Sequence, residues 1–389
     1  MSGLADLDAP AVSTRAFVRI GLVLSLAALL VGSLNFARYD WSGLPIVRAP
    51  ETAEKHVSAR CDEHIRPYTT ESGRVIEPVV IDEQQYLNLV RYYRGVPKSQ
   101  LQLTCLYDPF TLRSGMSWIA HWLPFEEGLA LGITNTFMLL LGLWLVLATL
   151  RRQGSSSRTL LVVGALYAVS WNVLVFGTAV LVDTGVVAAI ALCWYLLTTR
   201  RPWWLVPVLL LGYPLKETVG IVVPVALVWA WGEYRAGRRS LASAAAPVAA
   251  AAIAFVVGVA FWRQALPAAD AAWPVTPDIS AVEHNLTDVL SLGAFVVGVG
   301  PLLVPSILVG WRILRREGWL GLVQDPAVVG VVLALGICAW SFITVDLTPR
   351  LFWIGFPFAA SLTARWFSEG RQHDWIEGNR AIGALAGGT

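Results

Sequence analysis

Long apolar runs separated by short polar turns recur along most of this 389-residue sequence. A helix needs roughly 20 apolar residues to cross about 30 Å of hydrocarbon, since each residue adds about 1.5 Å. Runs approaching this length give about ten expected spans. They lie at 17–36, 128–150, 159–182, 184–199, 203–214, 218–232, 241–262, 289–311, 326–343 and 350–366. The pattern predicts an all-α polytopic membrane protein, and a composition with only 14% charged residues agrees with it.

The basic residues are distributed unevenly between the loops that join these runs. Short cytoplasmic loops are enriched in Lys and Arg, so the asymmetry predicts topology. One alternate set of loops holds Arg151, Arg152, Arg158, Arg200, Arg201, Arg235, Arg238, Arg239, Arg312, Arg315 and Arg316, whereas the other, the large first loop aside, holds only Lys216, Arg263 and Arg350. We therefore expect a multi-pass plasma-membrane protein with both termini in the cytoplasm.

This topology divides the chain into five parts. The first run follows Arg15, extends to "NFARYD" and has no A-x-A-like cleavage site, so it predicts a retained signal anchor. The expected parts are a cytoplasmic N-terminus (1–16), the signal-anchor helix (17–36), an extracytoplasmic loop with interfacial helices (37–127), a transmembrane bundle (128–366) and a cytoplasmic tail (367–389). No basic block is interleaved with aromatic residues, so nucleic acid is not an expected partner.

The stretch "LLLGYPLKETVGIVVP", residues 209–224, places Lys216 beside Glu217 in very apolar surroundings. Both flanks, "RRPWW" and "EYRAGRRS", are basic, so two crossings joined at "YPLKET" fit the topology better than one. Pro214 favours a break there, because proline lacks a backbone donor. A helix over 203–214 spans only about 18 Å, so it must either begin near Thr198 or end below the far surface.

The large first loop holds the candidate disulfide and the candidate acid–base residue. Cys61 and Cys105 predict a disulfide in an oxidising compartment, whereas Cys193 and Cys338 fall inside apolar runs and predict packing residues rather than a zinc site. In "IDEQQYLNLVRYYRGV", the apolar spacing predicts a helix with Asp82 at its start. Asp82 is therefore either a helix cap or a functional carboxylate.

Several motifs together resemble a known class of membrane enzymes. They are "DEQQYLNLVRYYRG" and "DPFTLRSGMSWIAHWLP" in the first loop, a span ending in "VLVDTG", and "LLLGYPLKETVGIVVP". The second motif ends in a Trp-rich amphipathic segment typical of the membrane interface. In this order the motifs are similar to those of the GT-C class of integral-membrane glycosyltransferases and its relatives. The resemblance covers roughly residues 17–232.

The resemblance implies transfer of a sugar from a polyprenyl-phosphate donor to an acceptor on the outer face: a cell-envelope glycan, lipid or protein. The inverting reaction is either metal-independent or assisted by a divalent cation, Mg²⁺ or Mn²⁺. Asp82 would be the general base, in competition with Asp40, which is closer to the end of the first helix. The remaining expected roles are donor-phosphate binding by Arg113, Lys216 and Arg350, and substrate orientation by Glu217, Asp183 and Tyr86.

Simpler interpretations compete with these roles. In the functional roles Glu217 would orient Lys216 or the acceptor, whereas more simply Lys216 and Glu217 form a solvated turn. Asp183 can cap the following helix, and Asp40 can be the first polar residue after a span. Two further functions stay open: a non-catalytic GT-C-like subunit that binds lipid or a partner, and a transporter or flippase, for which paired broken helices are expected.

Overall fold

The computed structural model describes residues 12–40, 68–69, 71, 73, 75–76, 81–101, 106–178, 181–272, 276–344 and 348–368. The predicted disulfide partners Cys61 and Cys105 and the C-terminal segment 369–389 lie outside these residues. Asp40 is the last residue of the first helix, and its side chain also lies outside the description.

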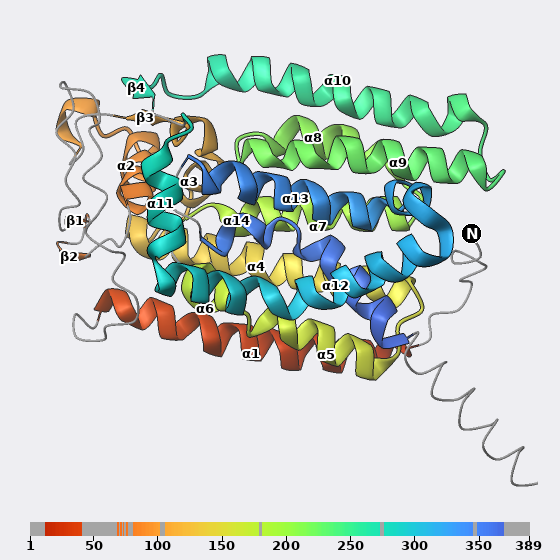
Figure 1. Ribbon diagram of the computed structural model, residues 1–389. Helices are drawn as coiled ribbons and strands as arrows, with labels where there is room; N and C mark the ends of the chain where they lie inside the picture. Colours follow the sequence, from red (N-terminus) through yellow and green to blue (C-terminus); the bar gives the residue numbers. More distant parts are fainter. Residues whose placement is uncertain are drawn as a thin grey trace, which may run out of the picture.

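Helices that run back and forth along a common axis make up the body of the protein (Figure 1). They are α1 (Thr14–Asp40), α4 (Glu127–Arg152), α5 (Ser157–Ala168), α6 (Trp171–Phe176), α7 (Asp183–Thr198), α8 (Leu205–Gly212), α9 (Val222–Arg235), α10 (Leu241–Ala265), α12 (Val289–Val323), α13 (Pro326–Phe342) and a helix at 356–368. Consecutive members are antiparallel, as expected for helices joined by short connections, except α5 and α6, which follow one another in the same direction.

The remaining elements are short. The helices α2 (Ile81–Tyr93), α3 (Gly115–Ala120) and α11 (Ile279–Thr287) gather at one end of the bundle, on the left of Figure 1. The helix α14 (Arg350–Trp353) precedes 356–368. Strands β1 (Tyr68–Thr69) and β2 (Val75–Ile76) pair antiparallel, whereas β3 (Tyr107–Asp108) and β4 (Ala271–Ala272) pair in parallel. Four 3₁₀ turns complete the set: η1 (Lys98–Gln100), η2 (Thr111–Arg113), η3 (Pro202–Trp204) and η4 (Glu217–Ile221).

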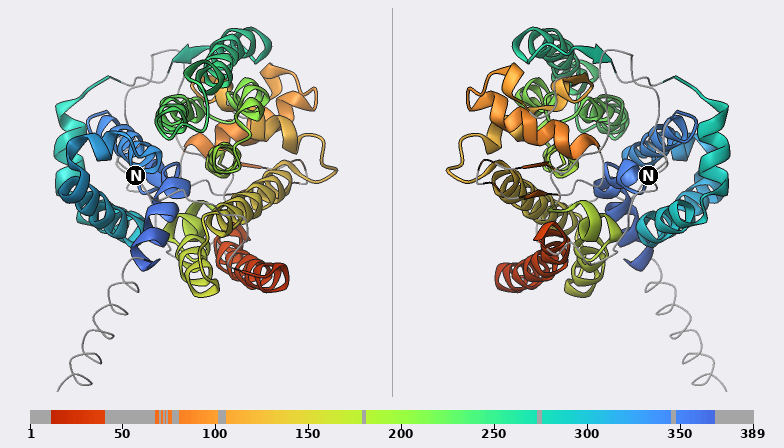
Figure 2. Two further views of the ribbon diagram at one scale, coloured as in Figure 1. Left: turned by 90° about the vertical axis from the view of Figure 1, so that its right-hand side faces the viewer. Right: turned by 90° about the vertical axis from the view of Figure 1, so that its left-hand side faces the viewer.

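Four helices of the described chain are long and apolar enough to cross a membrane: α1 over Thr14–Leu34, α4, α10 and α12. Helices α1, α10 and α12 lie at the periphery when the bundle is viewed along its axis (Figure 2). Their outward side chains are apolar and exposed, for example Leu22 at 60% and Ile253 at 64%. Apolar surface on the outside of a long-helix bundle is what a lipid environment requires. The protein is therefore a nearly all-α membrane protein.

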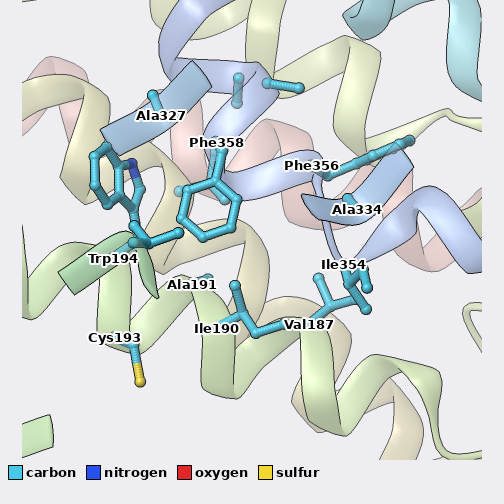
Figure 3. Close-up of a cluster of buried hydrophobic side chains, with 14 of the residues drawn as sticks. Val187, Ile190, Ala191, Cys193, Trp194, Ala327, Ala334, Ile354, Phe356 and Phe358 are labelled. Carbon is cyan, nitrogen blue, oxygen red and sulfur yellow. The ribbon is translucent and has the colours of Figure 1, made fainter. Parts of the chain in front are cut away.

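The interior of the bundle is built around α7. This helix is apolar on every side and almost wholly buried, as expected for a helix with neighbours all round. Trp194 of α7 packs edge-on against Phe358 at 5.3 Å between ring centroids, and its Nε1 donates to Ser361 Oγ at 2.9 Å. Ile190 of α7 and Ala334 of α13 belong to the same apolar cluster (Figure 3).

Two predicted continuous helices are broken. The run 159–182 divides into α5 and α6, because Ser170 accepts a hydrogen bond from the Val173 N–H and so caps a new helix start. The run 350–366 divides at Gly355, where a Cβ atom would lie 2.8 Å from the Cβ of Ala334. Short-range apolar periodicity did not reveal either break.

The break predicted at "YPLKET" is present. Helix α8 ends at Gly212, and α9 begins at Val222 after η4. The preceding helix α7 ends at Thr198, and the arm that contains α8 begins only at Pro202 with η3. An arm over 202–212 is about 16 Å long, so the turn that carries Lys216 is recessed into the bundle end rather than raised above it.

Candidate functional site

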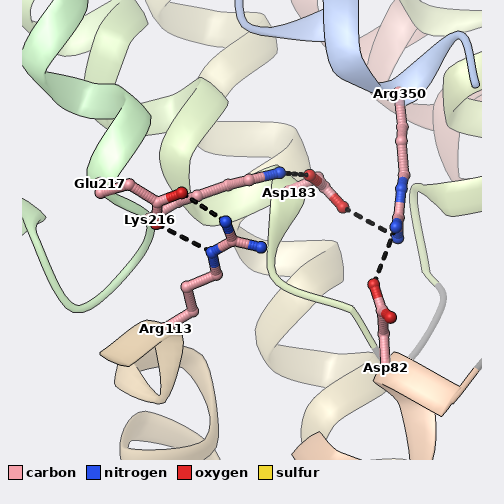
Figure 4. Close-up of polar contacts among 6 residues, drawn as sticks. All are labelled: Asp82, Arg113, Asp183, Lys216, Glu217 and Arg350. Carbon is pink, nitrogen blue, oxygen red and sulfur yellow. Dashed lines mark hydrogen bonds and ion pairs between the residues drawn. The ribbon is translucent and has the colours of Figure 1, made fainter. Parts of the chain in front are cut away.

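Six charged side chains from distant parts of the sequence meet at the bundle end that carries α2 and α3 (Figure 4). Three are carboxylates and three are cations, and ion pairs connect them. We call this group the charged cluster: Asp82, Arg113, Asp183, Lys216, Glu217 and Arg350. The sequence predicted all six as functional residues. Their mutual contacts were not predicted.

The most buried pair of the cluster joins Lys216 to Asp183. The Lys216 Nζ donates to Asp183 Oδ1 at 2.6 Å, and the two side chains are only 10% and 3% exposed. Asp183 opens α7 without capping it, because Val182 occupies the N-cap position. Burying one of these charges alone would be costly, so the pair holds the α8–α9 turn against the start of α7.

Arg350 connects this pair to the first loop. Its Nη2 donates to Asp82 Oδ2 at 2.8 Å, and its Nη1 lies 3.9 Å from Asp183 Oδ2. The cation is therefore shared between two carboxylates. Helix α2 begins at Ile81, so Asp82 lies in the first turn rather than at the cap. The contact crosses 268 positions of sequence, which explains why sequence reasoning did not find it.

Arg113 and Glu217 form the third pair, which is the one nearest to solvent. The Arg113 Nε donates to Glu217 Oε2 at 2.8 Å, and Nη2 donates to Oε1, so the contact is bidentate. Glu217 is 39% exposed. Burial alone would raise the pKa of Glu217, but the nearby Arg113 and Lys216 cations lower it overall. The predicted contact between Glu217 and Lys216 is replaced by these two separate pairings, because the neighbouring side chains diverge.

Tyr86 lies one helical turn after Asp82, on the same face of α2. Its side chain is buried, and its ring meets Phe110 edge-on at 5.9 Å between centroids. Burial raises the pKa of the Tyr86 phenol, and the charges of Arg113, Asp82, Asp183 and Arg350 act on it in both directions. The phenol therefore stays neutral beside the cluster.

A close backbone approach holds Arg113 against the turn that carries Glu217. The N–H of Gly115 donates to the Pro214 carbonyl at 2.8 Å. A Cβ atom at position 115 would lie 2.8 Å from that same oxygen, so only glycine fits without displacement. Sequence reasoning missed Gly115, although it lies two residues after the predicted phosphate-binding Arg113 in "RSG".

Asn135 of α4 fixes the start of α7. Its Nδ2 donates to the Leu181 carbonyl at 2.9 Å, and its Oδ1 accepts a hydrogen bond from Thr184 Oγ1 at 2.5 Å. Both side chains are buried. These bonds position the two residues on either side of Val182 and Asp183. An isolated asparagine in the apolar run "LGITNTFMLL" was the available signal, since unpaired amides are costly in such surroundings.

The described residues do not provide a metal-binding group. Among them, no set of three or more His, Cys, Asp and Glu side chains is arranged to hold a metal ion. Asp82, Asp183 and Glu217 all accept hydrogen bonds from cationic side chains. The carboxylates of the cluster thus do not fit a divalent cation in this arrangement, and we assign no chemical step to one.

Comparison with known proteins does not assign the chain to a family: no family model, curated protein or solved structure matches it. Function must therefore be argued from the cluster itself. Its arginines and lysine can bind a phosphate group, and its carboxylates can accept a proton, provided that incoming substrates exchange with the internal ion pairs.

Proposed function

We propose that the protein is a GT-C-like glycosyltransferase of the plasma membrane, which moves a sugar from a polyprenyl-phosphate donor to an extracytoplasmic acceptor. The observation that carries the proposal is the convergence of six charged residues at one end of an apolar helix bundle. Charges are rare in such surroundings unless they serve a substrate path or site. A lipid-linked phosphate needs cations at the end of a membrane bundle, and three cations of the cluster lie at such an end.

The proposed topology has ten crossings. In this scheme α5 with α6 form one crossing, α8 and α9 form two short ones, and α14 with 356–368 form the last. The antiparallel order then places most loop arginines at the end opposite to the cluster (Figure 1). By the positive-inside rule this arginine-rich end and both termini are cytoplasmic, and the charged cluster faces outward.

The proposed reaction uses the cluster in two ways. Asp82 accepts the proton of an acceptor hydroxyl as its oxygen attacks the anomeric carbon of the donor sugar. The bond from that carbon to the phosphate oxygen breaks, and its electron pair leaves with the polyprenyl phosphate. Lys216, Arg113 and Arg350 stabilise the charge that develops on the leaving phosphate. Attack from the face opposite to the leaving group inverts the anomeric centre. Asp40 is the competing candidate for the base.

The decisive test is turnover of polyprenyl-phosphate sugars by the purified protein in nanodiscs. We expect Asp82→Asn and Lys216→Ala each to reduce turnover by at least about 100-fold, as for loss of a general base or an electrostatic group. The pair formed by Lys98 and Asp270, whose atoms lie 2.7 Å apart, is a matched control at the same end of the bundle. Lys98→Ala and Asp270→Asn should retain turnover.

The outcomes separate the candidate functions. Full turnover by Asp82→Asn would reject Asp82 as the base and direct the search to Asp40. Binding of polyprenyl phosphate without turnover of any donor sugar would favour a non-catalytic GT-C-like subunit. Movement of a fluorescent polyprenyl phosphate across the bilayer, again without turnover, would favour a flippase.

A further inference from the structure

A separate cavity lies at the opposite end of the bundle from the charged cluster, where α1 and α5 begin (Figure 1). Its volume is about 610 Å³. We call it the arginine cleft. Its polar lining consists of Arg15 and Arg19 of α1, Arg158 of α5 and the serines Ser13 and Ser157. Its apolar lining consists of Ala16, Ile20 and Leu161 from the same two helices.

The three arginines of the cleft are exposed, and no carboxylate among the described residues pairs with them. Two other arginines at this end of the bundle are engaged. Arg151 donates to the Val12 carbonyl and to Thr14, and Arg238 binds the buried Glu233. The cleft is thus a concave site with three positive charges and two hydroxyl groups converging from two helices. Such a site favours an anion with several oxygen acceptors.

The helix starts add to the positive field. Helix α1 begins at Thr14 and α5 at Ser157, so the first turns of both line the cleft. Free backbone N–H groups and the helix dipole favour negative charge at this position. Ser13 and Ser156 satisfy only part of these donors, through the N–H groups of Ala16 and Thr159.

The apolar lining indicates where the anion comes from. Ile20 and Leu161 lie about one turn deeper along their helices than Arg15 and Arg158, and exposed Leu22 continues the apolar surface of α1. A soluble phosphate would leave this surface uncovered, whereas a phospholipid would place an acyl chain along it. We propose that the arginine cleft binds the phosphate group of an anionic membrane phospholipid. This site is independent of the proposed transferase reaction.

The test measures lipid binding by the full chain in detergent by native mass spectrometry, with phosphatidylglycerol, phosphatidylcholine and inorganic phosphate as separate probes. Each arginine near a membrane phosphate contributes about a five-fold effect on binding. We expect Arg19→Gln to weaken phosphatidylglycerol binding about five-fold and the triple variant Arg15→Gln, Arg19→Gln, Arg158→Gln to weaken it about 100-fold. Arg19→Lys keeps the charge and should bind within about two-fold of wild type.

The matched control is the triple variant Arg152→Gln, Arg235→Gln, Arg316→Gln, which removes the same charge from exposed positions at the same end of the bundle. It should retain most phosphatidylglycerol binding. Equal losses in both triple variants would overturn the proposal, because they would indicate a diffuse surface field. Equal binding of phosphatidylcholine, or competition by millimolar phosphate with no preference for lipid, would overturn the assignment to an anionic phospholipid. The single variants preserve the test if a triple variant fails to fold.

Discussion

Removing the Lys216 cation should destabilise the protein far more than removing an equally short ion pair at the surface. The Lys216–Asp183 contact is 2.6 Å long with side chains 10% and 3% exposed, whereas the Lys98–Asp270 contact is 2.7 Å long with side chains 37% and 36% exposed. Breaking a buried pair costs about 3 to 5 kcal/mol, and breaking an exposed one about 0.2 to 1 kcal/mol. We therefore expect Lys216→Met to lose several times more free energy of unfolding than Lys98→Met.

The physical cause is the uncompensated charge rather than the lost bond. In Lys216→Met, Asp183 stays buried, and among the described residues its remaining ion-pair contact is the Arg350 Nη1, 3.9 Å from its Oδ2. The double variant Lys216→Met, Asp183→Leu removes both charges and should recover at least about half of the loss. Unfolding by sodium dodecyl sulfate in mild detergent, followed by far-UV circular dichroism, gives the comparison. Equal losses in Lys216→Met and Lys98→Met, or no recovery in the double variant, would refute this reasoning.

Three further perturbations test the cluster and the contacts that position it. Gly115→Ala places a methyl group 2.8 Å from the Pro214 carbonyl oxygen, so we expect it to lower the free energy of unfolding by about 1 to 3 kcal/mol in the same assay. Gly73→Ala cannot serve as its control, because the positive φ of Gly73 adds backbone strain of its own. Asn135→Leu leaves buried partners unsatisfied and should cost about 1 to 3 kcal/mol. The folded-state pKa of Glu217 is lowered, so its pair with Arg113 contributes stability at neutral pH that is lost as the pH falls through that pKa. Glu217→Gln should remove this part of the acid sensitivity, which a series of melting temperatures against pH would measure.

Some positions of the charged cluster were predictable from the sequence because charged groups are costly in apolar surroundings. Lys216 stood out for this reason, whereas Asp183 was a candidate because it lies at the outer end of a span, and the structure places both in one buried pair. Their pairing was not predictable. Lys216 and Glu217 are neighbours in sequence, yet the extended backbone at Lys216 directs the two side chains to different partners. Local sequence therefore locates the charges, while the pairing depends on long-range packing.

The helical runs also divide into features that local sequence predicts and features that it does not. The predicted run 326–343 corresponds closely to α13, since Asp325 caps its start and Pro326 occupies its first turn, as short-range helix signals require. The run 159–182 did not reveal its break, because the apolar pattern continues through Ser170. The close approach of Gly355 to Ala334 depends on a helix far away in sequence. Apolar periodicity encodes neither the local cap at Ser170 nor the tertiary contact at Gly355.

The charge balance of the cluster has a consequence for the proposed reaction. Three carboxylates and three cations already neutralise one another, so a donor phosphate can bind only if a cation is released from its carboxylate. The Arg113–Glu217 pair is the most exposed of the three pairs, and an exposed pair costs the least to open. The Lys216–Asp183 pair is the most buried and opens last. On the proposed function, Arg113 is therefore the first cation that the phosphate meets. The Lys216–Asp183 pair holds the α8–α9 turn against the start of α7 while this exchange occurs.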